Sequence, residues 1–178
     1  MRKLGDEAGL SMVGLMILLP AYLLLLTGMI GAYGTFSRNY IRLESQWACL
    51  EEIRNIMNSL GDNLRYATTI DTQGTDEVRL THYTTEGQVV TDRYSFAGRS
   101  GDGGVIYLNS QPLSNLDRQG YVKIWELTFQ KLSPWKLQVH LVVGNRITGR
   151  SITVDRVLFS HCGWRMEQEN EVGNGDEG

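Results

Sequence analysis

AGLSMVGLMILLPAYLLLLTGMIGAYGTFS, residues 8–37, contains no Asp, Glu, Lys or Arg. As an α-helix rising about 1.5 Å per residue, this stretch would exceed the ~30 Å hydrocarbon core of a bilayer. Pro20 predicts a bend in that helix, because proline removes one backbone hydrogen bond and clashes with the preceding turn. The stretch therefore predicts a membrane-spanning helix near the N-terminus that holds a folded head on one side of the membrane.

The sequence after this stretch keeps a helical spacing of its apolar residues. They recur at intervals of three or four, which places them along one face of a helix. We expect one long helix from about Ser11 to about Ala67, apolar on all sides in its first half and striped in its second. The stripe needs a partner, and the β-rich half of the chain is the candidate. Its residues are Tyr40, Leu43, Trp47, Leu50, Ile53, Met57, Leu60 and Leu64.

The second half of the chain alternates apolar and polar residues with the period of a β-strand. Residues 84–87, Thr-Thr-Glu-Gly, separate two such runs and indicate a hairpin. Residues 100–104 are rich in glycine and indicate a loop. In the last run the pattern slips between Val154 and Val157, which predicts a bulge. The runs cover residues 78–83, 89–96, 105–108, 121–129, 135–143 and 152–159.

These runs predict an antiparallel sheet whose apolar face lies on the outer half of the helix. The expected fold class is therefore α+β, with a long N-terminal helix, half in the membrane and half amphipathic, packed under the sheet. In the run 121–129, the residues expected to share one face are Tyr121, Trp125, Leu127 and Phe129.

Charge gives no indication of a nucleic-acid partner. The net charge is −3, and residues 167–178 contain five acids and no base. We expect this acidic tail to be disordered. The rest of the chain carries no strong positive field of the kind that attracts nucleic acid.

Two cysteines, Cys49 and Cys162, are too few for a disulfide framework. They could form one bridge that closes a loop of more than a hundred residues, if the head lies in an oxidising compartment. They could equally be two separate buried thiols, which behave as small apolar side chains. Spacing along the sequence does not decide between these alternatives, since a bridge depends on the distance between the two side chains.

No arrangement typical of catalysis occurs in the sequence. His82, His140 and His161 lie in or beside predicted strands, without the spacing of metal ligands. His161 and Cys162 are neighbours, and neighbours on a strand point to opposite faces. No phosphate-binding glycine motif joins a strand to a helix. We therefore expect no enzyme activity, no metal site and no cofactor.

The start of the uncharged stretch carries a recognisable order of residues. Arg2 and Lys3 precede Gly9, after which come Leu10, Ser11 and a run of aliphatic residues. This order resembles the processing site of type IV prepilins and pseudopilins, where a short basic leader ends in Gly before an apolar residue and a Thr or Ser. The resemblance implies that a prepilin peptidase cuts between Gly9 and Leu10, and that the new N-terminus at Leu10 is methylated.

Gly14 departs from the family pattern, because the family has a Glu at this position, five residues into the mature chain. In the family this carboxylate pairs with the N-terminal amine of a neighbouring subunit within an apolar bundle, where an unpaired charge is costly. Gly14 cannot supply that pairing. Some minor pilins at filament tips also lack the Glu, so the resemblance implies a minor subunit that starts or caps a filament.

The order of one long helix and then several hairpins is similar to that of PilW-like minor pilins, J-type minor pseudopilins of type II secretion and competence pseudopilins. The resemblance implies assembly through the N-terminal helix, which Pro20 and the glycines of the span would let bend or pack closely. It implies a leader (1–9), a transmembrane half-helix (10–36), an amphipathic half-helix (37–67), a β-sheet head (68–166) and an acidic tail (167–178).

The partners implied are other pilin or pseudopilin subunits, the prepilin peptidase, the inner-membrane assembly platform and membrane lipid. The chain would be a single-pass protein of the cell membrane with an extracytoplasmic head, and would reach the surface in a filament. This orientation comes from the resemblance, because the cations on the two sides of the span are nearly balanced. The filament's role, whether adhesion, DNA uptake, motility or protein secretion, has no sequence signature here.

Alternatives to a processed filament subunit stay open. A cleavable secretory signal has a shorter apolar core than residues 8–37, without an internal proline. A simple membrane anchor needs nothing beyond the uncharged stretch, and would carry an unprocessed binding or sensing domain. An enzyme is a third class, which a polar pocket around His82 or His161 would favour.

Overall fold

The computed structural model describes residues 5–99, 103–114 and 120–165. The predicted tail at 167–178 and the first four residues of the predicted leader lie outside this part of the chain. The described residues form one long helix, α1 (Gly5–Tyr66), then eight strands, and then a short helical segment at residues 161–165. The strands are β1 (Thr69–Thr72), β2 (Glu77–Tyr83), β3 (Val89–Arg99), β4 (Gly103–Leu108), β5 (Gln111–Pro112), β6 (Val122–Ser133), β7 (Lys136–Asn145) and β8 (Ser151–Phe159).

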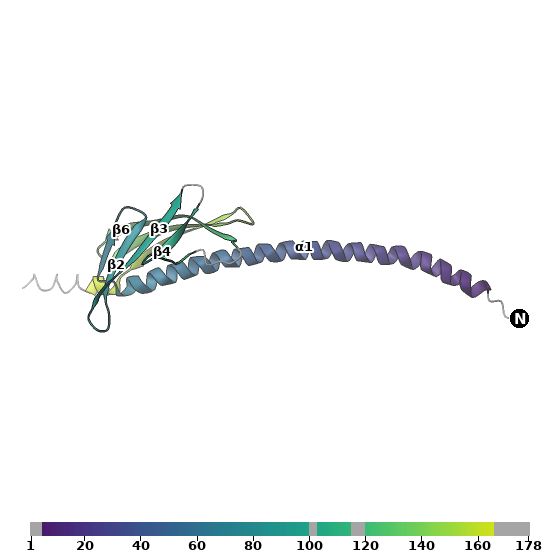
Figure 1. Cartoon of the computed structure of the whole chain (residues 1–178), viewed down its shortest axis with the longest axis horizontal. Coiled ribbons are helices and arrows are strands. Elements are labelled where there is room, and N and C mark those ends of the chain that lie inside the picture. Colours follow the sequence, from purple (N-terminus) through teal and green to yellow (C-terminus); the bar gives the residue numbers. More distant parts are fainter. Residues whose placement is uncertain (1–4, 100–102, 115–119, 166–178) are drawn as a thin grey trace, which may run out of the picture. The chain divides into compact units, whose positions relative to one another are not determined.

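Helix α1 is continuous over 62 residues and includes Pro20, so the prediction of one long helix is confirmed. The chain divides between Leu43 and Glu44 into two compact units. The first unit consists of the N-terminal part of α1. The second contains the rest of α1 and the whole sheet, and Figure 1 shows the strands lying along this C-terminal part of the helix.

The sheet is antiparallel, and the α+β fold predicted from the sequence is confirmed. Its strand order is β1-β2-β3-β4-β6-β7-β8, with β5 paired to β4. The predicted hairpin between β2 and β3 is present, because the Thr84 amide donates to the Gln88 carbonyl at 2.9 Å. Gly87 closes this turn with a φ of 78°, which glycine adopts without steric cost.

The prediction of a bulge in the last strand is wrong. Strand β8 pairs with β7 in unbroken register from Ser151 to Phe159. Arg156 occupies an inward position opposite Val139, and it remains exposed because β8 is an edge strand of the sheet. The apolar pattern slips at this point because a charged residue takes an inward position, and Val157 lies on the outer face.

The irregularities lie in β6 instead, with one register shift between Ile124 and Glu126. Trp125 sits at this shift and is 41% exposed, whereas Leu127 and Phe129 are buried. The predicted common face of Trp125 with these two residues is therefore wrong. A bulge inserts one residue and moves the side chain at that point away from the face that strict alternation assigns.

The Trp125 ring covers Gly144 on the neighbouring strand β7. An added Cβ at Gly144 would lie 1.7 Å from Trp125 Nε1, closer than any real contact. The Lys123 ammonium stands 4.3 Å from the centre of the same ring, on its face. The position is occupied by glycine because the indole needs the space above the backbone.

Replacing Gly144 with alanine is therefore expected to lower the free energy of unfolding by about 1–3 kcal/mol, the usual cost of overpacking. Urea denaturation of the full chain in detergent micelles measures this change. In the double variant Gly144→Ala/Trp125→Ala the clash is absent, so the combined loss should be smaller than the sum of the two single losses. Additive losses would contradict the packing of Trp125 on Gly144.

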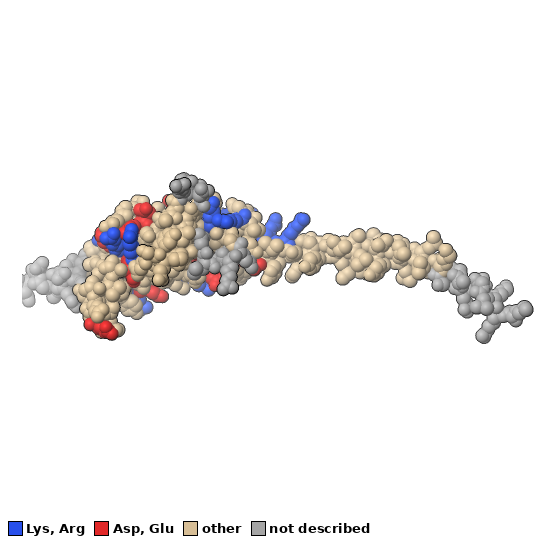
Figure 2. Space-filling view, in the orientation of Figure 1, with Lys and Arg blue, Asp and Glu red and all other residues tan. Residues whose placement is uncertain are grey.

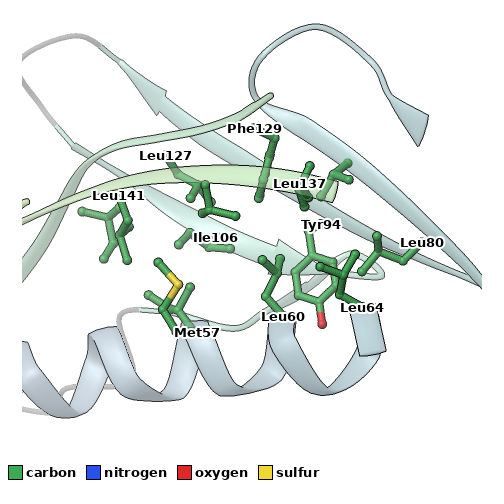
Figure 3. Close-up of a cluster of buried hydrophobic side chains, with 14 of the residues drawn as sticks. Met57, Leu60, Leu64, Leu80, Tyr94, Ile106, Leu127, Phe129, Leu137 and Leu141 are labelled. Atoms are coloured by element: carbon green, nitrogen blue, oxygen red, sulfur yellow. The ribbon is translucent and has the colours of Figure 1, made fainter. Parts of the chain in front are cut away.

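The hydrophobic core lies between α1 and the inner face of the sheet, as Figure 3 shows for Leu60, Leu64 and Tyr94. Each fully buried aliphatic or aromatic side chain contributes roughly 1.5–3 kcal/mol through the apolar area removed from water. The sheet residues of this core come from six strands, and they occupy alternate positions along β2 and β7. They are Ile70, Val78, Leu80, Tyr94, Ile106, Val122, Ile124, Leu127, Phe129, Leu137, Val139, Leu141 and Val143.

The predicted apolar stripe of the helix is buried only in its second half. Met57, Leu60 and Leu64 are buried, but Trp47 and Leu50 are 66% and 46% exposed. Tyr40 and Leu43, which precede them in the stripe, are exposed as well.

Before Met57 the sheet covers a different row of α1, in which Ser45, Cys49 and Glu52 are buried. The small side chains of Ser45 and Cys49 let strand β7 approach closely. The Asn145 side-chain amide donates to Ser45 Oγ at 2.9 Å, and Cys49 Sγ lies 3.9 Å from the Gly144 carbonyl. The stripe prediction is therefore wrong for the residues before Ile53.

Candidate functional site

The N-terminal part of α1 is the candidate membrane span. Within the described residues, one helix is long and apolar enough to cross a bilayer, judged by length and composition. Its large apolar side chains are unburied, with Leu24 at 74% and Ile30 at 70% exposure. Residues 8–37 contain no Asp, Glu, Lys or Arg, and Figure 2 shows this part of α1 without charged side chains up to the residues drawn in grey. A surface this apolar on all sides is typical of a helix covered by lipid or by other helices.

The predicted processing residues Gly9 and Leu10 lie in the first turns of α1. At Gly14, the position of the family's Glu, an added Cβ would meet nothing within 4 Å apart from its two chain neighbours and the backbone of its own helical turns. The same open space surrounds Gly28, Gly31 and Gly34. Packing within this chain therefore does not require a glycine at position 14. The glycines leave low points on the helix surface, where another helix can approach closely.

Neither cysteine forms a disulfide with another described residue. Cys49 is buried under the sheet, whereas Cys162 lies just after Ser160, whose hydroxyl donates to the Ala67 carbonyl beyond the end of α1. Cys49 and Ala67 are eighteen residues apart, which is about 27 Å along a helix. A disulfide needs Cα atoms within about 7 Å of each other. The structure therefore does not bring the possible bridge partners together.

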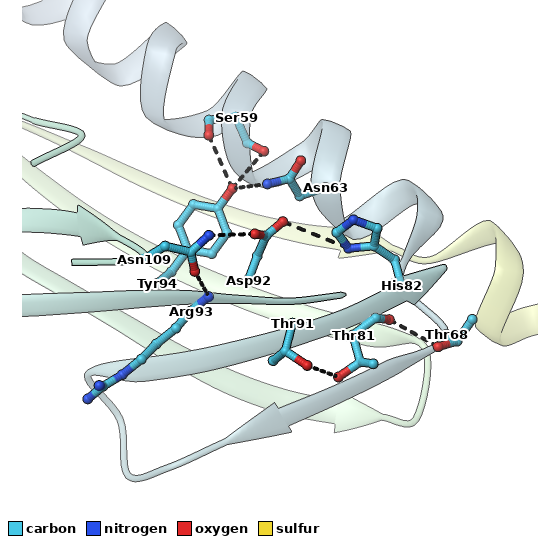
Figure 4. Close-up of polar contacts among 10 residues, drawn as sticks. All are labelled: Ser59, Asn63, Thr68, Thr81, His82, Thr91, Asp92, Arg93, Tyr94 and Asn109. Carbon is cyan, nitrogen blue, oxygen red and sulfur yellow. Dashed lines mark hydrogen bonds and ion pairs between the residues drawn. The ribbon is translucent and has the colours of Figure 1, made fainter. Parts of the chain in front are cut away.

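A polar network on the inner face of the sheet ties β3 to α1 (Figure 4). The buried Tyr94 hydroxyl donates to the Ser59 carbonyl at 3.0 Å and accepts from the Asn63 side-chain amide at 2.8 Å. Ser59 Oγ lies 3.1 Å from the same hydroxyl. Burial raises the pKa of the Tyr94 phenol, although the hydrogen bonds from Ser59 and Asn63 act in the opposite direction. The network fixes the position of the helix on the sheet.

Replacing Tyr94 with phenylalanine is expected to lower the free energy of unfolding by about 1–3 kcal/mol, because Ser59 and Asn63 lose a buried partner. The matched control is Tyr83→Phe, since Tyr83 is 57% exposed at the end of β2. Its effect is expected to stay within about 0.5 kcal/mol. Equal effects in urea denaturation of the two full-length variants would contradict a structural role for the Tyr94 hydroxyl.

His82 lies beside this network, on the same face of the sheet. Its Nδ1 is 3.8 Å from Asp92 Oδ2, and the Asn109 side-chain amide donates to Asp92 Oδ1 at 2.7 Å. Within the described residues, His82 Nδ1 is buried and has no hydrogen-bond partner. A histidine and a carboxylate form part of an acid–base site, but no hydroxyl or thiol nucleophile is hydrogen-bonded to His82 in the described part of the chain.

The other two histidines lie apart from His82. His140 is on the outer face of β7, as the alternation predicts, and its Nδ1 is 2.5 Å from Asp155 Oδ1 on β8. His161 lines an aromatic hollow of about 280 Å³ with Trp135, Phe159 and Trp164.

Ser160, the hollow's other lining residue, already donates to the helix end and accepts from the Gly163 amide at 3.0 Å. The hollow offers stacking surfaces without a second acid–base group. Across the described ranges, no cluster of three or more His, Cys, Asp or Glu is suited to a metal ion.

Glu77 joins two arginines on the outer face of the sheet. Arg93 Nη2 donates to its carboxylate at 2.6 Å and Arg79 Nε at 3.0 Å. The hydrogen bond from Arg93, followed by that from Arg79, lowers the pKa of Glu77 despite some desolvation. Arg79 and Arg93 are direct cross-strand partners, so Glu77 offsets their repulsion. No pattern in the sequence indicated this cluster or the role of Tyr94, because both depend on strand register and on how the helix lies on the sheet.

No protein-family model, curated protein or solved structure matches this chain. The fold is therefore described from the arrangement of its helix and strands alone. A long apolar N-terminal helix whose C-terminal part is packed on an antiparallel sheet is a pilin-like layout.

Proposed function

We propose that the chain is a non-enzymatic minor subunit of a type IV pilus-like or pseudopilus filament. A prepilin peptidase cuts between Gly9 and Leu10, and the apolar helix then passes from the bilayer into the core of the fibre. The partners are other pilin or pseudopilin subunits and the inner-membrane assembly platform. The head is extracytoplasmic.

The observation that carries this proposal is that the two parts of α1 differ in which of their surfaces are buried. Between Met12 and Phe36 the helix is apolar and unburied on all sides. Between Ser45 and Leu64 one face of the helix is buried under the sheet. One helix thus supports the head and also provides a surface that is stable in lipid or among other apolar helices. A filament subunit uses the same apolar surface in both environments.

Gly14 supports a minor role within such a filament. A bulk subunit pairs a carboxylate at this position with the amine of its neighbour, and glycine has no carboxylate. The space around Gly14 would accept a larger side chain, so the absence of Glu has no cause in the packing of this chain. A first or capping subunit has one neighbour fewer to engage, and this matches the missing carboxylate.

The experiment that tests the proposal is the mass of the full chain after co-expression with a prepilin peptidase. We expect a product that begins at Leu10 and carries one added methyl group. Gly9→Leu should block the cut, while Gly5→Leu, a glycine within the leader, should be processed like the natural chain. A product that keeps residues 1–9 would contradict the proposal and favour an unprocessed anchor with a binding or sensing head.

A further inference from the structure

Helix α1 has a second apolar face in the head, on the side away from the sheet. Ser45 and Cys49 are completely buried under the sheet. Trp47 is two residues from each of them, which places it about 160° around the helix from both. Its side chain is 66% exposed, and Leu50 beside it is 46% exposed. The largest apolar residues of this turn therefore point away from the core that the chain provides.

This face has a regular spacing and a defined C-terminal end. Tyr40, Leu43, Trp47 and Leu50, which we call the outer stripe, recur at intervals of three, four and three, the a/d spacing of a helical seam. After Leu50 the same side of the helix becomes polar and exposed, at Arg54. The stripe thus has a defined C-terminal end, and its spacing fits another α-helix.

A lipid bilayer around the N-terminal part of α1 would not extend far enough to cover Trp47 and Leu50, at the C-terminal end of the stripe. From Met12 to Leu50 a helix extends about 57 Å, whereas a bilayer with its headgroups is about 40–45 Å thick. Trp47 and Leu50 also share their turns with the charged Glu44 and Glu51. Lipid therefore does not account for the apolar surface at Trp47 and Leu50, and a protein is the other kind of partner that such a surface fits.

The two flanks of the stripe carry opposite charges. Glu44 and Glu51 lie on one flank, and neither forms a salt bridge with another described residue. On the other flank, Leu50 and the β7–β8 turn line a groove of about 240 Å³. This turn carries Arg146 and Arg150, both exposed and likewise without a salt bridge in the described ranges.

From these observations we propose that the outer stripe is the seam of a parallel, two-fold symmetric dimer, with α1 of a second copy lying along it. In a parallel pair, the flank with Glu44 and Glu51 faces the partner flank that carries Arg146 and Arg150. An antiparallel pair would place acidic flank against acidic flank, which is unfavourable. Opposite charges thus favour a second copy and fix its direction. The dimer does not depend on cleavage at Gly9, so it goes beyond the proposed function.

Cross-linking of the full chain in membranes tests the seam. In a Cys162→Ser background, Trp47→Cys is expected to give a disulfide-linked dimer, because equivalent a positions face each other. Asn55→Cys is the control, since Asn55 is exposed on the same helix but about 80° around it from Trp47. We expect the yield at position 47 to exceed that at position 55 by at least about tenfold. Equal yields, or adducts with another protein alone, would overturn the proposal.

A charge exchange tests the identity and direction of the partner. In the Trp47→Cys chain, Glu44→Lys/Glu51→Lys and Arg146→Glu/Arg150→Glu are each expected to reduce the dimer at least about tenfold. Co-expression of the two altered chains with different tags should restore a mixed dimer, because each flank then meets its opposite charge. An unchanged yield in the single sets, or no recovery in the mixture, would overturn the two-fold arrangement. Since neither experiment uses the peptidase, failure here is distinguishable from failure of the proposed function.

Discussion

Arginine in place of both Leu23 and Leu24 is expected to release the chain from the membrane fraction. Both residues lie in the middle of the uncharged part of α1 and are exposed, at 52% and 74%. On insertion scales an arginine at the centre of a membrane helix costs about 2.5–3.5 kcal/mol, so two cost about 5–7 kcal/mol. That amount shifts a partition equilibrium by several powers of ten.

The measurement is the distribution of the full chain between a washed membrane pellet and the supernatant. The matched control places two arginines elsewhere on the same helix, at Asn55 and Asn58, which are exposed on the part of α1 that carries the head. The control chain should stay in the pellet. Retention of the Leu23→Arg/Leu24→Arg chain in the pellet would show that another part of the molecule holds it at the membrane.

Leu137→Ala is expected to lower the free energy of unfolding by about 2–5 kcal/mol. Leu137 lies on β7, is fully buried, and belongs to the core between α1 and the sheet (Figure 3). Its truncation removes apolar contacts and leaves a cavity that the surrounding strands fill only in part. A loss of this size is a large fraction of the 5–15 kcal/mol that is typical of a folded domain.

Leu132→Ala is the matched control, because it removes the same atoms from the neighbouring strand β6 at a side chain that is 47% exposed. Its effect is expected to stay within about 0.5 kcal/mol. Urea denaturation of both full-length variants in micelles, followed by tryptophan fluorescence, compares them. Similar losses would contradict the inward direction of Leu137 and the assigned β6–β7 register.

The long helix and the antiparallel sheet follow from local patterns, and these predictions are confirmed. An uncharged stretch, a helical spacing and period-two alternation each report on a few neighbouring residues. The turn at residues 84–87 is equally local, since Gly87 supplies the positive φ. The α+β fold class therefore depends on signals that one sequence contains.

The face of α1 that meets the sheet could not be read in the same way. Periodicity identifies an apolar face, but it does not say which element covers it. Trp47 and Leu50 belong to such a face, yet the sheet covers Ser45 and Cys49 because small side chains allow strand β7 to approach. The exposed apolar residues and the residues under the sheet lie on different faces of α1, and periodicity alone does not separate the two faces.

The errors in the predicted face of Trp125 and in the predicted bulge of the last strand have a similar physical cause. Trp125 lies at a bulge, and Arg156 points inward on an edge strand where solvent still reaches it. Strict alternation holds only for a regular, covered strand. The contacts of Tyr94 with Ser59 and Asn63 join residues more than thirty positions apart, so no local pattern predicts them. Gly9 and Leu10, in contrast, are candidates on sequence resemblance alone.

Mass spectrometry of filaments sheared from the native host tests the proposed filament role most directly. The account predicts that the filament fraction contains this chain in a form that begins at Leu10, at lower abundance than a bulk subunit. A chain that is absent from the sheared filaments, and that remains in the membrane with Met1 through Gly9 intact, would contradict it.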